Sequence, residues 1–208
     1  FGTEAALVRQ QFVNGTHAIT CALFGALKAG DVLVSAVGAP YDTLLGAIGA
    51  VDKGHGSLKD YGVSYRQVEL LDNKPDPEGI KRTVSDPSVK AVLIQRSRGY
   101  STRDSLSVEA IGEMCRLIKQ ANPNAAILVD NCYGEFVETQ EPTHVGADLV
   151  VGSLIKNPGG GLAPTGGYIA GRRDLVEGAA MRLSAPGIGG ECGSTLGQNR
   201  LFYQGLFL

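Results

Sequence analysis

The sequence predicts an α/β fold, in which a mostly parallel sheet of seven strands is flanked by helices. Seven short apolar runs alternate largely with helical segments, and this alternation is typical of parallel sheets. The 208 residues are 43% hydrophobic, which is enough to bury the core of one large domain. Asp130 and Lys156 each follow one of the apolar runs. Since ligands bind outside the carboxyl ends of strands in open α/β sheets, we expect a functional site at that edge.

The composition argues against a nucleic-acid partner, a membrane span and a metal centre. The net charge is -2, and the Lys and Arg residues are scattered along the chain. No stretch of about 18 apolar residues occurs, and residues 1–10 do not resemble a signal peptide. The spacing of the cysteines (Cys21, Cys115, Cys132 and Cys192) is not that of a zinc site. We therefore expect a soluble protein of the reducing cytoplasm.

Residues 5–8 and 11–13 are the first two predicted strands, and an amphipathic helix follows that ends at Gly30. The helix begins at Gly15, Thr16 and His17. Free N–H groups at such a start, with the Thr16 hydroxyl and the positive end of the helix dipole, can bind a phosphate. The same residues are also compatible with an ordinary helix start that binds nothing.

Residues 31–36 form the next predicted strand, and Tyr41 follows its exit. An aromatic ring at that place can stack on a flat ligand, although a tyrosine that covers the edge of a core is the more frequent case. Residues 42–51 are predicted to be a helix weakened by glycines, and residues 52–60 a polar loop in which His55 is solvated.

Residues 63–71 alternate apolar and polar side chains, which indicates a strand near an edge of the sheet. A helix follows, with proline at its first position. Residues 90–95 form a central strand with an unusually polar exit that contains Arg96, Arg98 and Tyr100. Either arginine could hold a substrate carboxylate through its planar fork, or both could be ordinary surface residues.

Residues 107–120 are predicted to be an amphipathic helix with Val108, Ile111, Cys115 and Ile118 inward. Two buried strands follow, residues 126–129 and 147–151, and the helices 172–183 and 193–203 complete the chain.

The two buried strands deliver an acid and an amine to one edge of the sheet. Asp130 ends the first strand, while Ser153 and Lys156 follow the second and precede a run of glycines. The acid can bind the cationic end of a small molecule and the amine its carbonyl group, and pyridoxal phosphate has both. An Asp and a Lys alone would be a weak signal, but the strand ends, glycines and phosphate loop strengthen it.

These residues resemble a known family. VDN (129–131), ADLVVGSLIK (147–156) and GG (166–167) resemble the aspartate and lysine signatures of fold-type I pyridoxal-phosphate enzymes. The most similar group is the cysteine and methionine metabolism set, which includes cystathionine lyases and methionine γ-lyase. Within that set, DNCYGEF, SLIKNPGGGLAPTGGYIAG and QRSRGYS (95–101) resemble the aluminium resistance proteins. The resemblance extends from about Gly15 to the end of the chain.

The resemblance implies the large domain of the aminotransferase fold and assigns roles to the residues above. Lys156 would carry pyridoxal 5'-phosphate and move protons, and burial would lower its pKa. Asp130 would keep the ring nitrogen protonated, and Tyr41 would cover the ring. Gly15, Thr16, His17 and Ser153 would bind the phosphate. Tyr133 is expected to line the pocket and Cys132 to be packed, while Tyr100 replaces an asparagine of the related lyases.

The function expected from the resemblance is a carbon–sulfur lyase that acts on a sulfur-containing amino acid by β- or γ-elimination. The same residues would also serve an aminotransferase, or a binding or resistance protein without turnover. We expect residues 1–208 to be the large domain of a longer protein that forms a homodimer or homotetramer. These residues would lack the amino-terminal arm and the small carboxyl-terminal domain of that protein.

Overall fold

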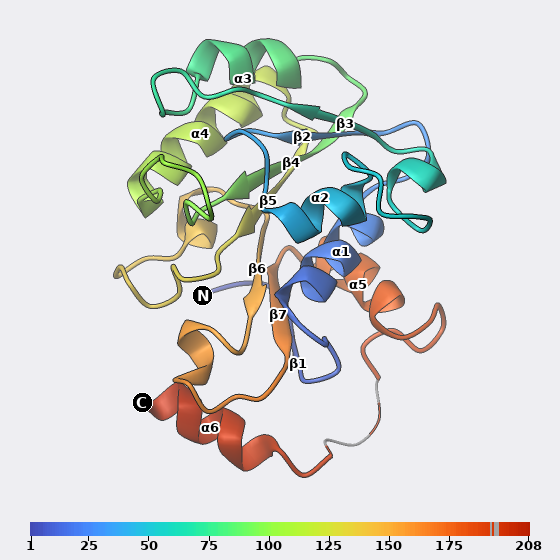
Figure 1. Cartoon of the computed structure of the whole chain (residues 1–208), viewed down its shortest axis with the longest axis vertical. Coiled ribbons are helices and arrows are strands. Elements are labelled where there is room, and N and C mark those ends of the chain that lie inside the picture. Colours follow the sequence, from blue (N-terminus) through green and yellow to red (C-terminus); the bar gives the residue numbers. More distant parts are fainter. Residues whose placement is uncertain (192, 194–195) are drawn as a thin grey trace.

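The computed structural model describes residues 1–191, 193 and 196–208, and one sheet of seven strands runs through it (Figure 1). The strand order is β1-β7-β6-β5-β4-β2-β3. The strands from β6 to β3 are parallel, whereas β7 is antiparallel to both β6 and β1. The predicted mostly parallel sheet is therefore confirmed. The strands are β1 (Ala5–Arg9), β2 (Val32–Ser35), β3 (Ser64–Gln67), β4 (Val89–Gln95), β5 (Ala126–Asp130), β6 (Leu149–Ser153) and β7 (Gly167–Gly171).

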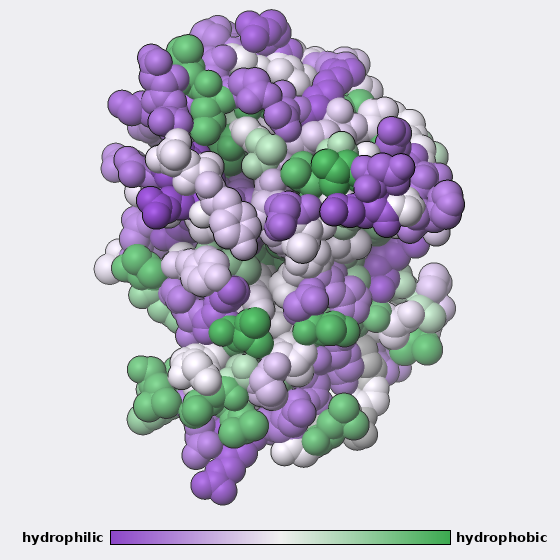
Figure 2. All heavy atoms as spheres, in the orientation of Figure 1, coloured by the Kyte–Doolittle hydropathy of each residue, from purple (hydrophilic) through white to green (hydrophobic). Residues whose placement is uncertain are grey.

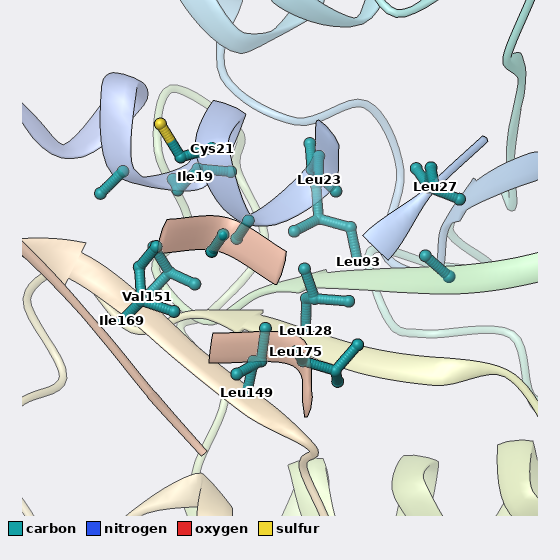
Figure 3. Close-up of a cluster of buried hydrophobic side chains, with 14 of the residues drawn as sticks. Ile19, Cys21, Leu23, Leu27, Leu93, Leu128, Leu149, Val151, Ile169 and Leu175 are labelled. Carbon is teal, nitrogen blue, oxygen red and sulfur yellow. The ribbon is translucent and has the colours of Figure 1, made fainter. Parts of the chain in front are cut away.

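Helices cover both faces of the sheet, so that two separate cores form. Side chains from alternate positions of a strand enter opposite cores, as Leu93 and Ile94 of β4 do. One core lies under α1, α2 and α5, and Figure 3 shows part of it around Leu23, Leu93 and Leu128. The other lies under α3 and α4. The helices are α1 (Gly15–Ala26), α2 (Asp42–Ile48), α3 (Pro77–Val84), α4 (Val108–Ala121), α5 (Arg173–Leu183) and α6 (Asn199–Phe207).

Burial on both faces explains why the central strands are uninterrupted apolar runs. Every residue of β2, β5 and β6 is buried. The predicted inward face of residues 107–120 is also confirmed, because Val108, Ile111, Cys115 and Ile118 are buried in α4.

The packing of α1 on α5 depends on a glycine. A Cβ atom on Gly25 would lie 2.5 Å from the main-chain nitrogen of Ala179, which is closer than real Cβ atoms approach. The missing side chain lets the backbones of the two helices touch.

Several predicted elements differ from the observed ones. Residues 11–13 are not a strand, and Phe12 instead buries its ring in the core. The seventh strand is β7, whose glycine-flanked sequence was not predicted to be extended. Strand β6 includes Ser153, and β3 is shorter than residues 63–71. The helix expected at 193–203 begins at Asn199, and residues 194 and 195 of that range lie outside the described residues, as does Cys192.

The surface is polar over much of the view in Figure 2, with apolar side chains gathered at its lower end over α6. Leu206, Phe207 and Leu208 of this region are exposed. An apolar pocket of about 630 Å³ lies between β1 and α6, and none of the predicted site residues line it. Among the described residues, no helix combines the length and the apolar character needed to cross a membrane.

Candidate active site

The carboxyl ends of β4, β5 and β6 meet at one edge of the sheet, where they form a second pocket of about 710 Å³. The strand register pairs Gln95 with Asp130 and Asp130 with Val151, so the acid lies at the centre of this edge. Nine of the predicted site residues line the pocket, namely Gly15, Thr16, Tyr41, Arg98, Tyr100, Asp130, Tyr133, Ser153 and Lys156. His17 and Arg96 are not among the lining residues.

The start of α1 forms one wall of the pocket. The side chain of Asn14 caps the helix, because its Oδ1 accepts a hydrogen bond from the His17 N–H at 2.8 Å. The His17 N–H, which belongs to the expected phosphate site, thus has a partner within the chain. The His17 ring also points elsewhere, with Nδ1 accepting a bond from the Val13 N–H at 3.2 Å. The N–H groups of Gly15 and Thr16 precede the first intrahelical bond and remain suited to an anion.

Gly15 brings this helix start directly against β6. A Cβ atom on Gly15 would lie 3.0 Å from the Cβ of Ser153 and 3.6 Å from the Sγ of Cys132. A side chain at position 15 would therefore press against Ser153, and glycine allows the close approach. The Ser153 hydroxyl is buried and donates a long hydrogen bond of 3.5 Å to the Gly166 carbonyl.

Tyr41 links two neighbouring elements of the site. Its main-chain N–H donates to Oε1 of Gln95 at 2.9 Å, and its phenolic oxygen lies 3.0 Å from the Thr16 hydroxyl. Burial raises the pKa of Tyr41 above its ordinary value, so the phenol is neutral in the physiological range. Gln95 was not among the expected site residues, although a polar side chain that ends a central strand is a detectable signal.

Asp130 is buried at the base of the pocket. Its Oδ1 accepts a hydrogen bond from the Cys132 N–H at 3.2 Å. Burial raises the pKa of this carboxyl group to about 6, although the bonds from Cys132 and the charge of Lys156 act in the opposite direction. Most of the Asp130 population is therefore ionised at neutral pH, as a partner for a protonated ring nitrogen must be.

Lys156 is half-buried, and its amine donates a hydrogen bond to the phenolic oxygen of Tyr133. The pKa of Lys156 is raised, because acceptance by Tyr133 favours the charged amine more strongly than burial disfavours it. Burial lowers that pKa as expected, but the hydrogen bond to Tyr133 outweighs it. The tyrosine enters the pocket from a turn after β5, in which its φ is +69°.

The two arginines after β4 lie in different environments. Arg98 and the 91%-exposed Tyr100 stand at the mouth of the pocket. Arg96 is only 4% exposed, and all three of its guanidinium nitrogens bind groups of the protein itself. The geometry therefore differs from the expected substrate contact, because the buried Arg96 does not line the pocket. Over the described part of the chain, no cluster of His, Cys, Asp or Glu side chains could hold a metal ion.

Comparisons with known proteins identify the family and relatives of this chain. The family model for methionine gamma-lyase matches residues 1–208. The uncharacterized protein YnbB of Bacillus subtilis (strain 168) is 50% identical over 210 residues, which span 100% of this chain and 50% of YnbB. L-methionine gamma-lyase of Treponema denticola is 27% identical over 184 residues, 88% of this chain and 41% of that enzyme.

A solved structure of a carbon-sulfur lyase involved in aluminum resistance from Clostridium novyi NT is also similar. It is 52% identical to this chain, with a TM-score of 0.95. The matched region covers 100% of this chain and 50% of the chain in that structure. The chain thus spans about half the length of the relatives that it matches.

Proposed function

Because this chain belongs to the methionine gamma-lyase family, we propose that it forms the cofactor-binding part of a carbon–sulfur lyase that uses pyridoxal 5'-phosphate. The substrate would be a sulfur-containing amino acid, cleaved by β- or γ-elimination. The observation that carries the proposal is one pocket that combines the start of a helix, a buried acid and a lysine. The names of the relatives support the type of reaction.

The donor groups of the pocket fit this cofactor. The N–H groups of Gly15 and Thr16 would hold the phosphate dianion. Asp130 would pair with the ring nitrogen, and Tyr41 would lie against the ring. Lys156 would be the point of covalent attachment. The Ser153 hydroxyl, whose bond to the Gly166 carbonyl is long, would add a donor to the phosphate.

The residues of the chain would divide the chemistry among them. When bound, the cofactor supplies an electron-withdrawing ring that stabilises negative charge on the α-carbon of the substrate. The Asp130 carboxylate holds a proton on the ring nitrogen, which sustains that withdrawal. The Lys156 amine, once neutral, removes the α-proton, and Tyr133 stands where it can accept a hydrogen bond from that amine. Arg98 is the remaining arginine at the pocket and would bind the substrate carboxylate.

The proposal is tested with the natural full-length protein and a panel of sulfur amino acids, by assaying 2-oxo acid, ammonia and thiol together. A lyase releases all three, whereas an aminotransferase consumes an acceptor oxo acid without releasing ammonia or thiol. Bound cofactor without any product would identify a binding or resistance protein. Light scattering on the same sample tests the expected homodimer or homotetramer.

A second experiment tests the lysine. Borohydride reduction followed by peptide mapping should place the pyridoxyl group on Lys156. Lys156→Ala should abolish the label, and Lys28→Ala, a change at an exposed lysine, should leave it unchanged. A pyridoxyl group on any other lysine would contradict the assignment.

A further inference from the structure

Arg96 is a buried cation that the proposed chemistry does not use. Its Nη1 donates to Oδ1 of Asn131 and to the carbonyl of Gly134, both at 2.8 Å. Its Nη2 donates to Oε1 of Glu138 at 2.6 Å, and its Nε donates to the Leu106 carbonyl at 3.3 Å. Burying an arginine is costly unless its donors are all used. Here each of its three nitrogens donates to the protein, and two of the bonds end on a single turn.

That turn has an unusual backbone. The Gly134 N–H donates to the Asn131 carbonyl at 2.9 Å, which closes a turn over residues 131–134. Tyr133 inside it has a φ of +69°, and Phe136 just beyond has a φ of +63°. Side chains other than glycine rarely adopt such angles, and they persist only where the surroundings hold them. An external support for the turn is therefore required.

The guanidinium of Arg96 provides this support from the inside of the turn. A Cβ atom on Gly134 would lie 2.4 Å from the Cδ of Arg96 and 2.5 Å from its Nη1. The arginine thus lies directly against the glycine backbone while it holds the residues at both ends of the turn. On the other side of the turn, the Tyr133 hydroxyl accepts the hydrogen bond from Lys156. The amine also lies 4.3 Å from the centroid of the Tyr133 ring.

We propose that Arg96 is a positioning residue, which holds the turn of residues 131–134 so that the Tyr133 hydroxyl stays against the Lys156 amine. Arg96 acts through Tyr133 and touches no reacting atom. The inference rests on the proposed function in one respect, because that function makes the protonation state of Lys156 important for the reaction. Arg96, which does not line the pocket, would thus influence the protonation state of Lys156 from outside it.

Tyr133 dominates the electrostatic surroundings of Lys156. Its hydrogen bond is the largest influence on the pKa of Lys156 and raises it. The other titratable and charged groups around this pocket come from the end of β5, from the exit of β4 and from the start of α2; they are Asp130, Cys132, Arg98, Tyr100, Tyr41 and Asp42. If the turn moves, the amine loses its nearest acceptor and releases its proton more readily.

The test measures the titration of Lys156 in the cofactor-free full-length protein. Competitive acetylation with acetic anhydride between pH 6 and pH 11, read by peptide mass spectrometry, gives the pH at which Lys156 becomes reactive. Tyr133→Phe should lower this midpoint by about one pH unit, the equivalent of a hydrogen bond to a charged group. Arg96→Lys keeps the charge but loses the fork, and should lower the midpoint in the same direction.

Two further variants separate positioning from a general structural effect. The double variant Arg96→Lys with Tyr133→Phe should titrate as Tyr133→Phe alone, because the arginine acts only through the tyrosine. Arg66→Lys is the matched control, since Arg66 is an exposed arginine that pairs with Asp86. It should leave the midpoint unchanged.

A wild-type midpoint in Tyr133→Phe would show that the Tyr133 hydroxyl does not act on the Lys156 amine. A wild-type midpoint in Arg96→Lys would show that Arg96 does not position Tyr133. If Arg96→Lys does not fold, Glu138→Gln replaces it, because Glu138 is more exposed and contributes a single contact to Arg96. This variant should give a smaller shift of the same sign, and no shift would likewise overturn the proposal. Failure to find a pyridoxyl group on Lys156 would refute the proposed function but not this relationship.

Discussion

The hydroxyl group of Thr16, at the start of α1, lies 3.0 Å from the phenolic oxygen of Tyr41, at the start of α2. The contact connects the two helix starts that border the pocket. With the hydroxyl engaged by Thr16, we expect a flat cofactor to meet the ring of Tyr41.

The ring face of Tyr41, rather than its hydroxyl, should therefore matter for cofactor binding. Tyr41→Phe keeps the aromatic face and should bind pyridoxal phosphate within about threefold of the wild-type affinity. Tyr41→Ala should lose about tenfold, as expected for the loss of one aromatic contact. Absorbance titrations of the two variants give the dissociation constants. Equal losses in both would mean that the hydroxyl is the important group.

Replacement of Asp130 should separate binding from turnover. Asp130→Asn is isosteric and leaves the pocket shape intact, so the cofactor should remain bound. Turnover should fall on the order of 100-fold, because the neutral amide no longer holds a proton on the ring nitrogen. Asp86→Asn, a change at a surface acid that pairs with Arg66, is the control. Near wild-type turnover of Asp130→Asn would show that the acid is structural.

Two side-chain caps in the same protein allow a matched test of the anion site. Asn14 caps α1 through the His17 N–H at 2.8 Å, and Ser107 caps α4 through the Ala110 N–H at 3.1 Å. Asn14→Ala and Ser107→Ala should each lower the free energy of unfolding by about 1 kcal/mol. Only Asn14→Ala should also weaken the binding of pyridoxal phosphate. The same loss of affinity in both variants would show that the start of α1 has no special role.

Glu135 should make the stability of the protein depend on pH. Its Oε1 accepts a hydrogen bond from the Tyr168 hydroxyl at 2.8 Å, and within the described chain its buried Oε2 has no partner. Burial raises the pKa of this carboxyl group from 4.5 to about 7. Between these two pH values the unfolded chain loses the proton and the folded protein retains it, so the free energy of unfolding falls as pH rises.

Glu135→Gln should remove this dependence, because glutamine resembles the protonated carboxyl group. The free energy of unfolding of the variant minus that of the wild type should be larger at pH 8 than at pH 4.5, by about 2 kcal/mol. Urea unfolding across this range measures the difference, with Glu113→Gln on the exposed face of α4 as the control. Parallel pH curves for Glu135→Gln and the wild type would contradict the assignment.

The contact between α1 and α5 gives a prediction about stability alone. Gly25→Ala places a methyl group 2.5 Å from the backbone of α5 and should lower the free energy of unfolding by about 2–3 kcal/mol. Gly46→Ala is the control, because its methyl group would meet only the flexible side chain of Lys53 at 3.0 Å. That change should be neutral or stabilise α2. Thermal unfolding of both variants tests the difference, and a stable Gly25→Ala would mean that the helices can separate.

Much of the fold could be predicted from the sequence because burial leaves a local record. A parallel strand with both faces covered is an uninterrupted apolar run, which identifies β2, β4, β5 and β6. Parallel strands also present their carboxyl ends at one edge, and for this reason the sequence alone predicts that Asp130 and Lys156 share one pocket.

The remaining features depend on which distant segments meet, and no local pattern records that. Strand β7 is held by antiparallel pairing with β1 and β6, and its flanking glycines conceal it. Arg96 and Arg98 are two positions apart and alike in the sequence, yet only the approach of the turn after β5 makes one of them buried. The pKa of Lys156 is raised rather than lowered because Tyr133, 23 residues away, supplies an acceptor. The local pattern of residues thus established which side chains reach the edge of the sheet. Their partners were set by the folded arrangement, since these contacts join segments that are far apart in the chain.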